Sequence, residues 1–466
     1  MLVSTIVMLN GFILIYLVIF SAGYTFLLLM SVRNVLLRFE EVQIGDVLDL
    51  MHSHALPPVT VIIAAYNEEE FILETVNSVL KSTYEKTHIM IVSDGSTDQT
   101  LPKLIETYEL YKIHCVVPSI IKGTSEIFGY YISNKYHNIT LIDKAHRCKS
   151  DSLNIGLNAC RTPFFITVDA DSIVEPDAIS ELVFYMMTRE HAVAVGGSIY
   201  ILNSCDYGDG EIKKEILPRK YVEGVQACEY LRSFLFNRAG WNPIQGALSY
   251  SGTATLFEHK AILDIGGFDL ENPSNDFEVI INLHAQRKHA EIPYQIGFSA
   301  AAGVWTDVPV TLRQFWNQRT NWQIGMMRSL LRHKYMLFNS KYGLVGLFHY
   351  PFYLFGETLG AVVEFAAYVL LFLSWYLGIF STYVVILFFV LCLGFITLLT
   401  IATVLMNLIS YNKYGGLQDL SRILFYVLTE PIGFRQFSVV CRVLATIKYF
   451  FIKREAPDTL ITKERH

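Results

Sequence analysis

Three short apolar runs in the first part of the chain constrain its fold more than any other feature. They extend from Val59 to Ala65, from Ile89 to Ser93 and from Phe164 to Val168, and polar turn residues bound each of them. Their β-branched and aromatic residues are typical of buried strands. Because the runs alternate with helical patterns, we expect a mainly parallel α/β sheet, in which ligands bind at the carboxyl ends of the strands.

Acidic side chains occur where these strands are expected to end. Asp94 follows the second run in VSDGSTD, Asp169 and Asp171 follow the third in VDADS, and Asp276 lies further on in SNDFE. The alternation of Asp169 and Asp171 directs both carboxylates to one side of an extended segment. One or two carboxylates plus substrate phosphates suit Mg²⁺ or Mn²⁺. Taken alone, Asp94 is more simply a turn or cap residue.

The composition indicates that part of the chain lies in lipid. Of 466 residues, 52% are hydrophobic and 17% are charged, and the mean hydropathy is +0.36. Residues 1–32 carry no charge and are long enough to span a bilayer, and no signal-peptide cleavage pattern is present. Between Lys341 and Lys413 the only charges are Glu357 and Glu364, so this stretch can supply two spans with a break near Gly378.

Two interpretations of Glu357 and Glu364 stay open. They lie seven residues apart and share one helical face. In the first, they lie near the membrane surface or bond to neighbouring helices. In the second, they line a path for a polymer.

Basic residues flank the expected spans and predict their orientation. Arg33 and Arg38 follow the first span, and Arg328 and Lys334 are among those before the second. The positive-inside rule then places the intervening domain in the cytoplasm, and we expect an integral protein of a bacterial plasma membrane. The basic stretch 433–454 suits either an interfacial helix or a third span, and the basic C-terminal end favours the interfacial helix.

Charge and cysteine content argue against other classes of protein. The net charge of −6 argues against broad nucleic-acid binding. The seven cysteines form no CxxC pair, so neither disulfides nor structural zinc are expected. The sequence does not indicate an oligomeric state.

Local patterns add expectations along the chain. Asn67 and Glu70 follow the first strand and fit a capping box for the next helix. Residues 119–146 and 203–219 are polar and without clear period, so we expect surface loops there. The expected parts are a transmembrane helix (1–32), a linker (33–56), a catalytic domain (57–308), amphipathic interfacial helices (309–342), two transmembrane helices (343–411) and C-terminal interfacial or membrane helices with a basic tail (412–466).

A series of motifs resembles that of a known family. In order they are PPVTVIIAAYNEE, VSDGSTD, KSDSLN, VDADS, YSGTATLFEHKAILDIGGFD, SND and QRTNW. Their order and spacing resemble family 2 membrane glycosyltransferases, the group of cellulose, chitin, hyaluronan and poly-N-acetylglucosamine synthases. The resemblance runs from about Pro57 to the spans near Ser410. It implies a Rossmann-like GT-A domain fused to transmembrane and interfacial helices.

The resemblance also implies roles in binding a nucleotide sugar, with uridine diphosphate as the expected nucleotide. Asp94 is expected to bind the nucleoside, opposite a wall formed by Ala65, Tyr66 and Glu68. Lys149 matches a lysine near the diphosphate, although KSDSLN is looser than the usual motif and a solvated surface lysine is the alternative. Asp171 is the expected metal ligand. Asp169 is expected either to support the metal site beside Asp171 or to contact the ribose.

Asp276 is expected to be the general base. The family usually presents this base after a glutamate, whereas Asn275 occupies that position here. Glu278 matches an acid found near the acceptor in related sequences. Such a base must lie within hydrogen-bond reach of the acceptor hydroxyl.

QRTNW departs from the family pattern because Asn321 replaces an arginine that would grip the diphosphate. Arg319 is one residue that can compensate, while Gln318 and Trp322 are expected at the acceptor end.

The leading hypothesis is an inverting, metal-dependent glycosyltransferase that extends a polysaccharide or glycan at the inner membrane face and can secrete it. Its partners would be a nucleotide-sugar donor, a glycan or lipid-linked acceptor and membrane lipids. One alternative is a non-processive transferase that makes a lipid-linked sugar or oligosaccharide. Another, suggested by Asn275 and Asn321, is an inactive relative that acts as a partner or glycan-binding subunit.

Overall fold

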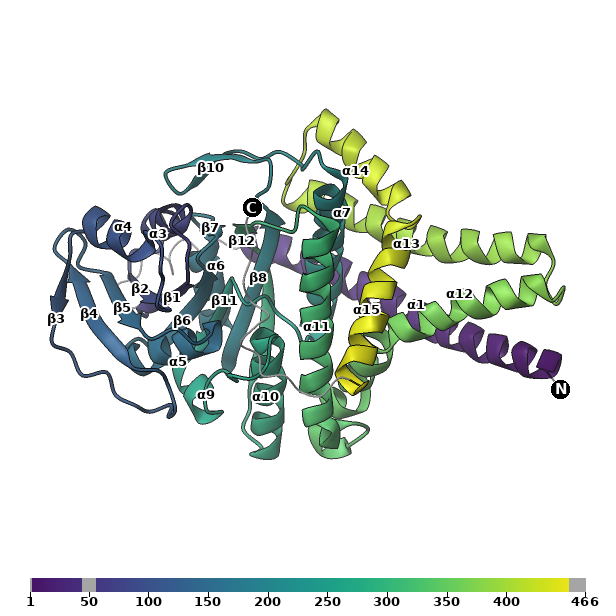
Figure 1. The fold of residues 1–466 in the computed structure, drawn as a ribbon, viewed down its shortest axis with the longest axis horizontal. Coiled ribbons are helices and arrows are strands. Elements are labelled where there is room, and N and C mark those ends of the chain that lie inside the picture. The colour runs from purple at the N-terminus through teal and green to yellow at the C-terminus, as the bar shows by residue number, and fades with distance from the viewer. Residues whose placement is uncertain (1, 44–55, 452–466) are drawn as a thin grey trace. The chain divides into compact units, whose positions relative to one another are not determined.

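The computed structural model describes residues 2–43 and 56–451, so most of the predicted linker and the basic tail lie outside the described residues. The chain forms two compact units (Figure 1). The helical unit takes Met1–Leu37, Leu217–Gly246 and Pro309–Lys453, and the sheet unit takes Arg38–Ile216 and Ala247–Val308. Residues 217–246 thus group with the helices, although the sequence suggested one continuous domain over 57–308.

Within the described residues, ten strands of the sheet unit form one sheet. In spatial order they are β3 (Leu110–Ile113), β4 (Ile127–Ser133), β5 (Ile139–Lys144), β2 (Thr87–Ser93), β1 (Val59–Ala65), β6 (Phe164–Asp169), β11 (Thr255–Glu258), β8 (Ala192–Ile201), β12 (Gln295–Thr306) and β7 (Ser172–Val174). The three predicted strands are β1, β2 and β6, and β1 pairs in parallel with both others. Antiparallel pairs such as β6 with β11 make the whole sheet mixed.

The prediction of loops over 119–146 is wrong. This stretch contains β4 and β5, and β5 pairs in parallel with β2 inside the sheet. In β5 the side chains of Ile139 and Leu141 are buried. Thr140, Asp143 and Lys144 make half of this six-residue strand polar, so its apolar pattern was not recognised. Residues 203–219 contain the short antiparallel pair β9 (Asp206–Gly208) and β10 (Glu211–Lys214).

Helices of the sheet unit connect the strands and carry candidate side chains. They are α3 (Ile72–Leu80), α4 (Thr100–Thr107), α5 (Lys149–Ala159), α6 (Ala178–Thr188), α9 (His259–Asp264) and α10 (Asn275–His289). Helix α5 is buried over ten of its eleven residues, Lys149 being the exception. Its Gly156 packs against Ile62 of β1, where a Cβ atom would meet the isoleucine side chain. Close packing of this kind fixes α5 against β1.

The capping-box prediction for Asn67 and Glu70 is wrong. Helix α3 begins at Ile72, and no side-chain cap is formed at Phe71. Asn67 adopts a left-handed backbone conformation (φ 53°), and its Oδ1 accepts a hydrogen bond from the Thr97 backbone N–H at 2.8 Å. Asn67 therefore joins the loop after β1 to the loop after β2.

The helical unit contains the long apolar helices. Its main helices are α1 (Leu2–Gln43), α7 (Tyr221–Leu231), α8 (Ala239–Trp241), α11 (Leu312–Arg332), α12 (Gly360–Tyr376), α13 (Thr382–Ser410), α14 (Leu417–Thr429) and α15 (Phe434–Phe451). Among the described residues, Val3–Leu36 and Thr382–Ser410 are long and apolar enough to cross a membrane. Val345–Thr358 and Gly360–Tyr376, bent by 45°, count as a third if the pair is one span.

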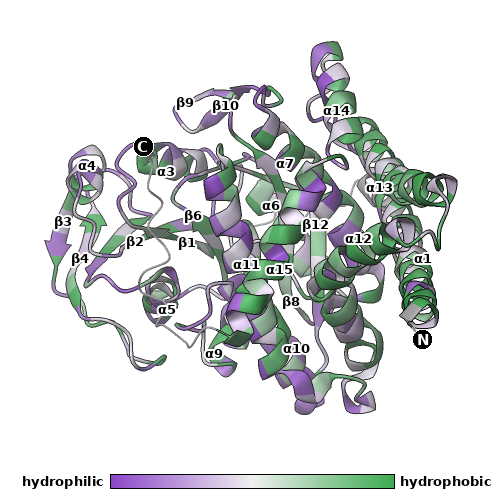
Figure 2. Cartoon of the chain, turned by 45° about the vertical axis from the view of Figure 1, so that its right-hand side comes forward, coloured by the Kyte–Doolittle hydropathy of each residue, from purple (hydrophilic) through white to green (hydrophobic). Residues whose placement is uncertain are grey.

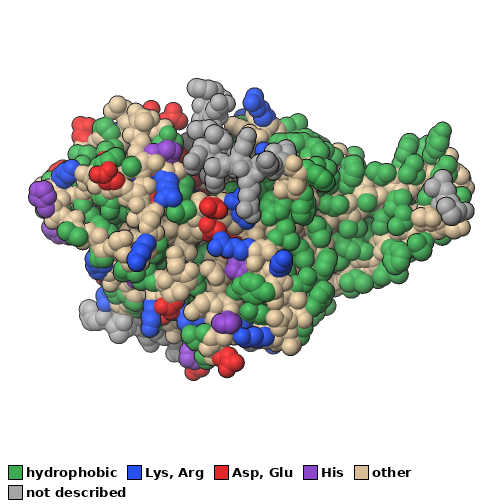
Figure 3. Space-filling view, turned by 60° about the horizontal axis from the view of Figure 1, so that its bottom comes forward, with side chains coloured by type: hydrophobic (Ala, Val, Ile, Leu, Met, Phe, Trp, Pro, Cys, Tyr) green, Lys and Arg blue, Asp and Glu red, His purple; other side chains and the backbone are tan. Residues whose placement is uncertain are grey.

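The outer faces of these helices are hydrophobic along their length (Figure 2). The side chains of Phe12, Phe372 and Leu391 on these helices are exposed. The space-filling view shows one end of the molecule on which hydrophobic side chains predominate (Figure 3). Exposed apolar surface of this extent is typical of contact with lipid. Helix α15 is not one of the candidate spans within the described residues, and it packs along α11 and α12.

Several charged side chains of the helical unit bond to partners within the same unit. Arg435 donates to both carboxylate oxygens of Glu364, at 2.7 and 2.8 Å. Arg232 contacts Glu430 at 2.5 Å. Glu357 accepts hydrogen bonds from the Tyr24 hydroxyl (3.0 Å) and from the Asn237 amide (3.1 Å). Both glutamates of the predicted spans therefore bond to other elements of this unit, as the first interpretation of the sequence proposed.

Candidate active site

The candidate site lies at the carboxyl ends of neighbouring strands of the sheet unit. In the sheet register Ala65 pairs with Ser93, and Ala64 pairs with Asp169. The backbone N–H of Asp94 donates to Ala65 O at 2.8 Å. The parallel pairing of β1 with β2 and β6 thus brings three segments, far apart in sequence, to one edge of the sheet.

Lys149 lies among the predicted acidic residues. Its Nζ bonds to Asp169, and about a third of its side chain (35%) remains exposed. Burial disfavours the charged ammonium, but the attraction of Asp169, Asp276 and Asp171 outweighs it and raises the pKa of Lys149. A methyl group placed on Gly252 would lie 3.4 Å from Lys149 Nζ and 3.5 Å from Asp276 Cβ. Lys149 is therefore a paired cation within the carboxylate cluster and not a solvated surface lysine.

Asp169 and Asp171 can contribute to a metal site. The backbone N–H of Asp169 donates to Thr253 Oγ1 (3.2 Å), and the Thr306 hydroxyl donates to Asp171 Oδ1 (3.5 Å). Asp171 is only 5% exposed. No group of three or more Asp, Glu, His or Cys side chains suited to a metal ion occurs among the described residues. The donor set fits a Mg²⁺ or Mn²⁺ ion that takes its other ligands from substrate phosphates and water.

Asp94 is buried in a network that the sequence did not reveal. The fully buried Lys144, the last residue of β5, bonds to Asp94 and contacts Asp151 at 2.8 Å. Arg147 N–H donates to Asp94 Oδ1 at 3.0 Å, and His146 Nδ1 lies 3.2 Å from Oδ2. The polar composition of residues 119–146 indicates a loop, and the sequence therefore does not single out Lys144. The alternating run ITLIDK, which ends on a lysine, was the signal that could have identified it.

The predicted nucleoside wall lies beside this network. The Tyr66 ring stacks on His146, with ring centroids 4.1 Å apart and planes inclined by 25°. The Glu68 backbone N–H donates to Thr100 Oγ1 at 2.8 Å. The Glu68 carbonyl accepts from the N–H groups of Phe71 and Ile72, at 3.1 and 2.9 Å, where α3 begins. These bonds fix the backbone that follows Ala65.

Asp276 occupies the first turn of α10. The preceding Asn275 is buried, and its Nδ2 donates to Ser150 Oγ at 2.9 Å. Because Ser150 follows Lys149, this bond ties the first turns of α5 and α10 together. Glu278 is 3% exposed, and its Oε2 accepts from Asn272 Nδ2 at 3.4 Å, so it is directed into the protein.

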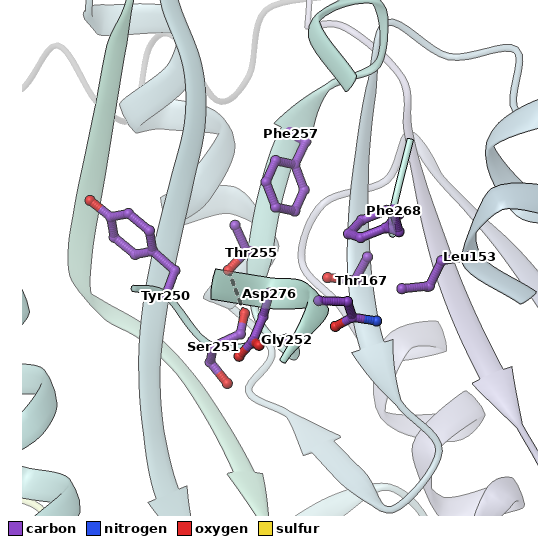
Figure 4. Close-up of a pocket in the computed structure, with 10 residues that line it drawn as sticks. Leu153, Thr167, Tyr250, Ser251, Gly252, Thr255, Phe257, Phe268 and Asp276 are labelled. Carbon is purple, nitrogen blue, oxygen red and sulfur yellow. Dashed lines mark hydrogen bonds between the residues drawn. The ribbon is translucent and has the colours of Figure 1, made fainter. Parts of the chain in front are cut away.

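A small pocket adjoins Asp276 (Figure 4). Its lining combines apolar and polar side chains from β6, β11, α5, α10, the loop before β11 and the loop before α10. The residues are Leu153, Thr167, Tyr250, Ser251, Gly252, Thr255, Phe257, Phe268, Asn275 and Asp276. The Thr255 hydroxyl donates to Ser251 O at 2.7 Å, which holds the loop at the pocket.

The QRTNW residues belong to helix α11 of the helical unit. Arg319 is 5% exposed and contacts Glu229 at 2.9 Å. Its guanidinium lies 4.3 Å from the ring centre of Trp322 and 4.6 Å from that of Phe315. Trp322 is 40% exposed. Gln318 lies on the same helix, one residue before Arg319. Arg319 is thus held by an ion pair and two aromatic rings within its own unit.

The mixed sheet, with carboxylates at the ends of β2 and β6, defines a GT-A type glycosyltransferase fold. A solved structure of a mannosyltransferase from Pyrobaculum calidifontis, in complex with GDP-mannose and Mn²⁺, is similar to this chain with a TM-score of 0.52. The match covers 92% of this chain and all of that chain, at 14% sequence identity. The predicted fold class is confirmed.

The sequence profile of the family described as glycosyltransferase-like family 2 matches residues 57–325. The chain belongs to this family, which confirms the predicted enzyme class. It is similar to poly-β-1,6-N-acetyl-D-glucosamine synthase of Staphylococcus aureus, with 28% identity over 288 residues, and to that of Staphylococcus epidermidis, with 27% over 276. These matches cover 61% and 59% of this chain, but only 58% and 56% of the length of the relatives.

Proposed function

We propose that this protein is an inverting glycosyltransferase that moves a sugar from a nucleotide donor, expected to be a UDP-sugar, to a growing glycan. The observation that carries the proposal is the position of Lys149, which bonds to Asp169 and is attracted by Asp171 and Asp276. A cation among these carboxylates suits a site that neutralises a diphosphate beside a general base. Family membership supports the same chemistry.

In the proposed reaction Asp276 accepts the proton of the acceptor hydroxyl as its oxygen attacks the anomeric carbon of the donor. The bond from that carbon to the diphosphate oxygen breaks, and the nucleoside diphosphate leaves with the bonding electrons. Lys149 stabilises the departing negative charge. Because attack is direct, the configuration inverts and no covalent enzyme intermediate forms.

Asp171 and Asp169 would hold a Mg²⁺ or Mn²⁺ ion against the diphosphate. Such an ion would neutralise charge on the leaving group. Asp94 is proposed to bind the nucleoside, with Ala65, Tyr66 and Glu68 on the opposite wall. The ion pair with Lys144 holds the Asp94 carboxylate in place.

The acceptor is proposed to be a glycan, either polymeric or lipid-linked. Gln318, Trp322 and Glu278 are the predicted acceptor residues, whereas Arg319 is the candidate for the donor diphosphate. The burial of Glu278 favours an indirect role for it. The names of the staphylococcal relatives favour polysaccharide synthesis over a single addition to a lipid. The candidate spans support a membrane location, and the positive-inside rule favours a catalytic domain on the cytoplasmic side of a bacterial membrane.

Transfer assays on the detergent-purified chain test this proposal. Labelled sugar is expected to move from a UDP-sugar to a glycan, and a chelator should stop the transfer. Asp276→Asn should reduce turnover by about 10²-fold to 10⁴-fold while nucleotide binding persists. Asp177→Asn is the matched control because Asp177 is exposed. Full turnover in Asp276→Asn would show that Asp276 is not the general base. Transfer that a chelator does not affect would show that Asp171 does not act through a metal ion.

A further inference from the structure

The side chain of His146 lies between Tyr66 and Asp94, which bind the nucleoside in the proposed function on which this inference rests. Its ring stacks on the Tyr66 ring, with centroids 4.1 Å apart and planes inclined by 25°. Its Nδ1 lies 3.0 Å from the Asp94 carbonyl oxygen and 3.2 Å from Asp94 Oδ2. Because both of these oxygens accept hydrogen bonds, Nδ1 carries the proton and donates to Asp94. The imidazole therefore contacts the aromatic wall and the carboxylate at the same time.

The two oxygens of the Asp94 carboxylate have different partners. Oδ1 accepts hydrogen bonds from the Lys144 ammonium and from the backbone N–H of Arg147. Oδ2 is the oxygen that faces His146. The uracil of a nucleotide offers the same two features as the imidazole, a flat ring and one ring N–H. A base that stacks on Tyr66 and donates to Asp94 Oδ2 would therefore need the position that the imidazole occupies.

The backbone of His146 is held in place, whereas its side chain is half exposed. The adjacent N–H group of Arg147 donates to Asp94 at 3.0 Å. Gly95 has a φ of 65° and allows a close approach, since a Cβ atom there would lie 2.8 Å from the His146 backbone nitrogen. The His146 side chain is 52% exposed. Rotation about its side-chain bonds can therefore uncover the Tyr66 ring without a change in the backbone.

We infer that His146 determines the affinity of the donor site for nucleotides, because its imidazole occupies the place of the nucleobase and the donor displaces it on binding. Each nucleotide that binds then breaks one stacked ring pair and one hydrogen bond of the free protein. After transfer, the return of the imidazole to Tyr66 competes with the nucleoside diphosphate and favours its release. His146 acts on nucleotide binding and takes no part in the transfer of the sugar.

Calorimetric titration of the detergent-purified, full-length chain with UDP and with pyrophosphate, in the presence of Mn²⁺, tests this inference. His146→Ala should bind UDP at least about fivefold more tightly than the wild type, since the competing ring is gone. Its affinity for pyrophosphate should stay unchanged, because pyrophosphate has no base.

His137→Ala is the matched control, because His137 is exposed in the turn before β5. It should bind both ligands as the wild type does. Unchanged or weaker UDP binding by His146→Ala would overturn the inference. An equal gain for pyrophosphate would also overturn it, because the effect would then not concern the base.

Two further variants test the stacked pair itself. His146→Phe keeps a ring beside Tyr66 but cannot donate to Asp94, so its gain in UDP affinity should be smaller than that of His146→Ala. In a Tyr66→Ala background, His146→Ala should give a smaller gain than in the wild type, because the two rings act as a pair. Equal gains in the two backgrounds, or a gain in His146→Phe as large as in His146→Ala, would overturn the inference.

Steady-state kinetics distinguish this inference from the proposed function. In His146→Ala the KM for the sugar donor and the inhibition constant of UDP should fall by similar factors. A fall in kcat with both constants unchanged would place His146 in the transfer step and overturn the inference. Transfer from no nucleotide sugar, together with UDP binding that tightens in His146→Ala, would overturn the proposed function alone.

Discussion

At the level of single residues, Lys144 is fully buried and contacts two carboxylates, those of Asp94 and Asp151. Removal of one member of a buried ion pair leaves an uncompensated charge and costs about 3–5 kcal/mol. Lys144→Met should therefore lower the free energy of unfolding by an amount of this order. Denaturant unfolding monitored by fluorescence would measure the loss.

The exposed Lys122 supplies the control for this prediction. Lys122→Met should leave stability nearly unchanged, because exposed charges contribute little. In the double variant Lys144→Met with Asp151→Asn, part of the loss should be recovered. A stable Lys144→Met protein would show that Asp94 does not depend on this lysine.

Lys149 gives a prediction of pH dependence. Its pKa is raised because the surrounding carboxylates outweigh the effect of burial. The stability that this charge contributes is then fully present below the unfolded pKa of about 10.4 and is lost only as the pH rises through the higher folded value. We expect Lys149→Met to weaken UDP binding by a constant factor from about pH 7 to pH 10. If the wild type and Lys149→Met bound UDP equally well near pH 8, Lys149 would not be the charged residue that binds the diphosphate.

The hydrogen bond between Asn275 and Ser150 predicts a coupling between the base and Lys149. Asn275→Ala should lower kcat about tenfold, since small displacements of a base are costly. A double-mutant cycle with Ser150→Ala should show non-additive effects on kcat, because the two side chains share one bond. Additive effects would assign Asn275 a separate role.

The sequence indicated Asp94, Asp169 and Asp171 because they end or follow recognisable apolar runs, whereas Asp276 was indicated only by the resemblance of SND to a family motif. It did not reveal Lys144 or the bond from Asn275 to Ser150. Lys144 ends β5, a strand of only six residues. The bond from Asn275 to Ser150 joins residues that are 125 positions apart. Contacts of this kind depend on the packing of α5 and α10, which no local pattern encodes.

At the level of elements, α10 carries Asp276 at one end and a buried histidine further along. His284 Nδ1 lies 2.8 Å from the Tyr294 hydroxyl, and burial lowers the pKa of His284 to about 4. Below pH 6.5 the unfolded chain binds a proton that the folded chain excludes. Stability should therefore fall as the pH drops from about 6.5 to 4, by up to about 3 kcal/mol from this group.

Thermal unfolding of His284→Gln across this pH range checks the prediction. The variant should lose less stability with acid than the wild type, because glutamine does not titrate. His137→Gln, at an exposed position, should behave as the wild type does. Equal acid sensitivity in all three proteins would exclude His284 as the source.

Ion pairs hold elements of the helical unit together. Arg435 of α15 bonds to Glu364 of α12 through two hydrogen bonds. Glu364→Gln should leave the half-buried guanidinium of Arg435 without its counter-charge and lower the melting temperature in detergent by a few degrees. Glu364→Gln combined with Arg435→Gln should melt closer to the wild type than either single variant. Unchanged melting of the single variants would show that this pair does not stabilise α15.

Predictability also differs among elements. The strands β1 and β6 and the break between α12 and α13 followed from strong apolar patterns. Strands β4 and β5 did not, because β4 does not alternate clearly and the alternating run of β5 is only six residues long. The start of α3 was misplaced because Asn67 bonds across to Thr97 instead of capping the helix.

At the level of the whole molecule, three separate segments of the chain form the helical unit. Residues 217–246 pack within this unit and bury side chains such as Val225, Leu231 and Phe236. A fragment of residues 57–308 should therefore expose apolar surface and aggregate without detergent. Size-exclusion chromatography would show this, and a monodisperse fragment in plain buffer would contradict the division of the chain.

Mass spectrometry of the products is the decisive measurement for the proposed function. The purified chain would receive Mg²⁺ or Mn²⁺, membrane lipids and a panel of nucleotide sugars, with Asp276→Asn in parallel. We predict a series of products that increase by the mass of one sugar residue, made by the wild type and absent from Asp276→Asn. A glycan product of equal yield from the variant, or no glycan or glycolipid from any donor, would contradict the site built around Lys149 and its carboxylates.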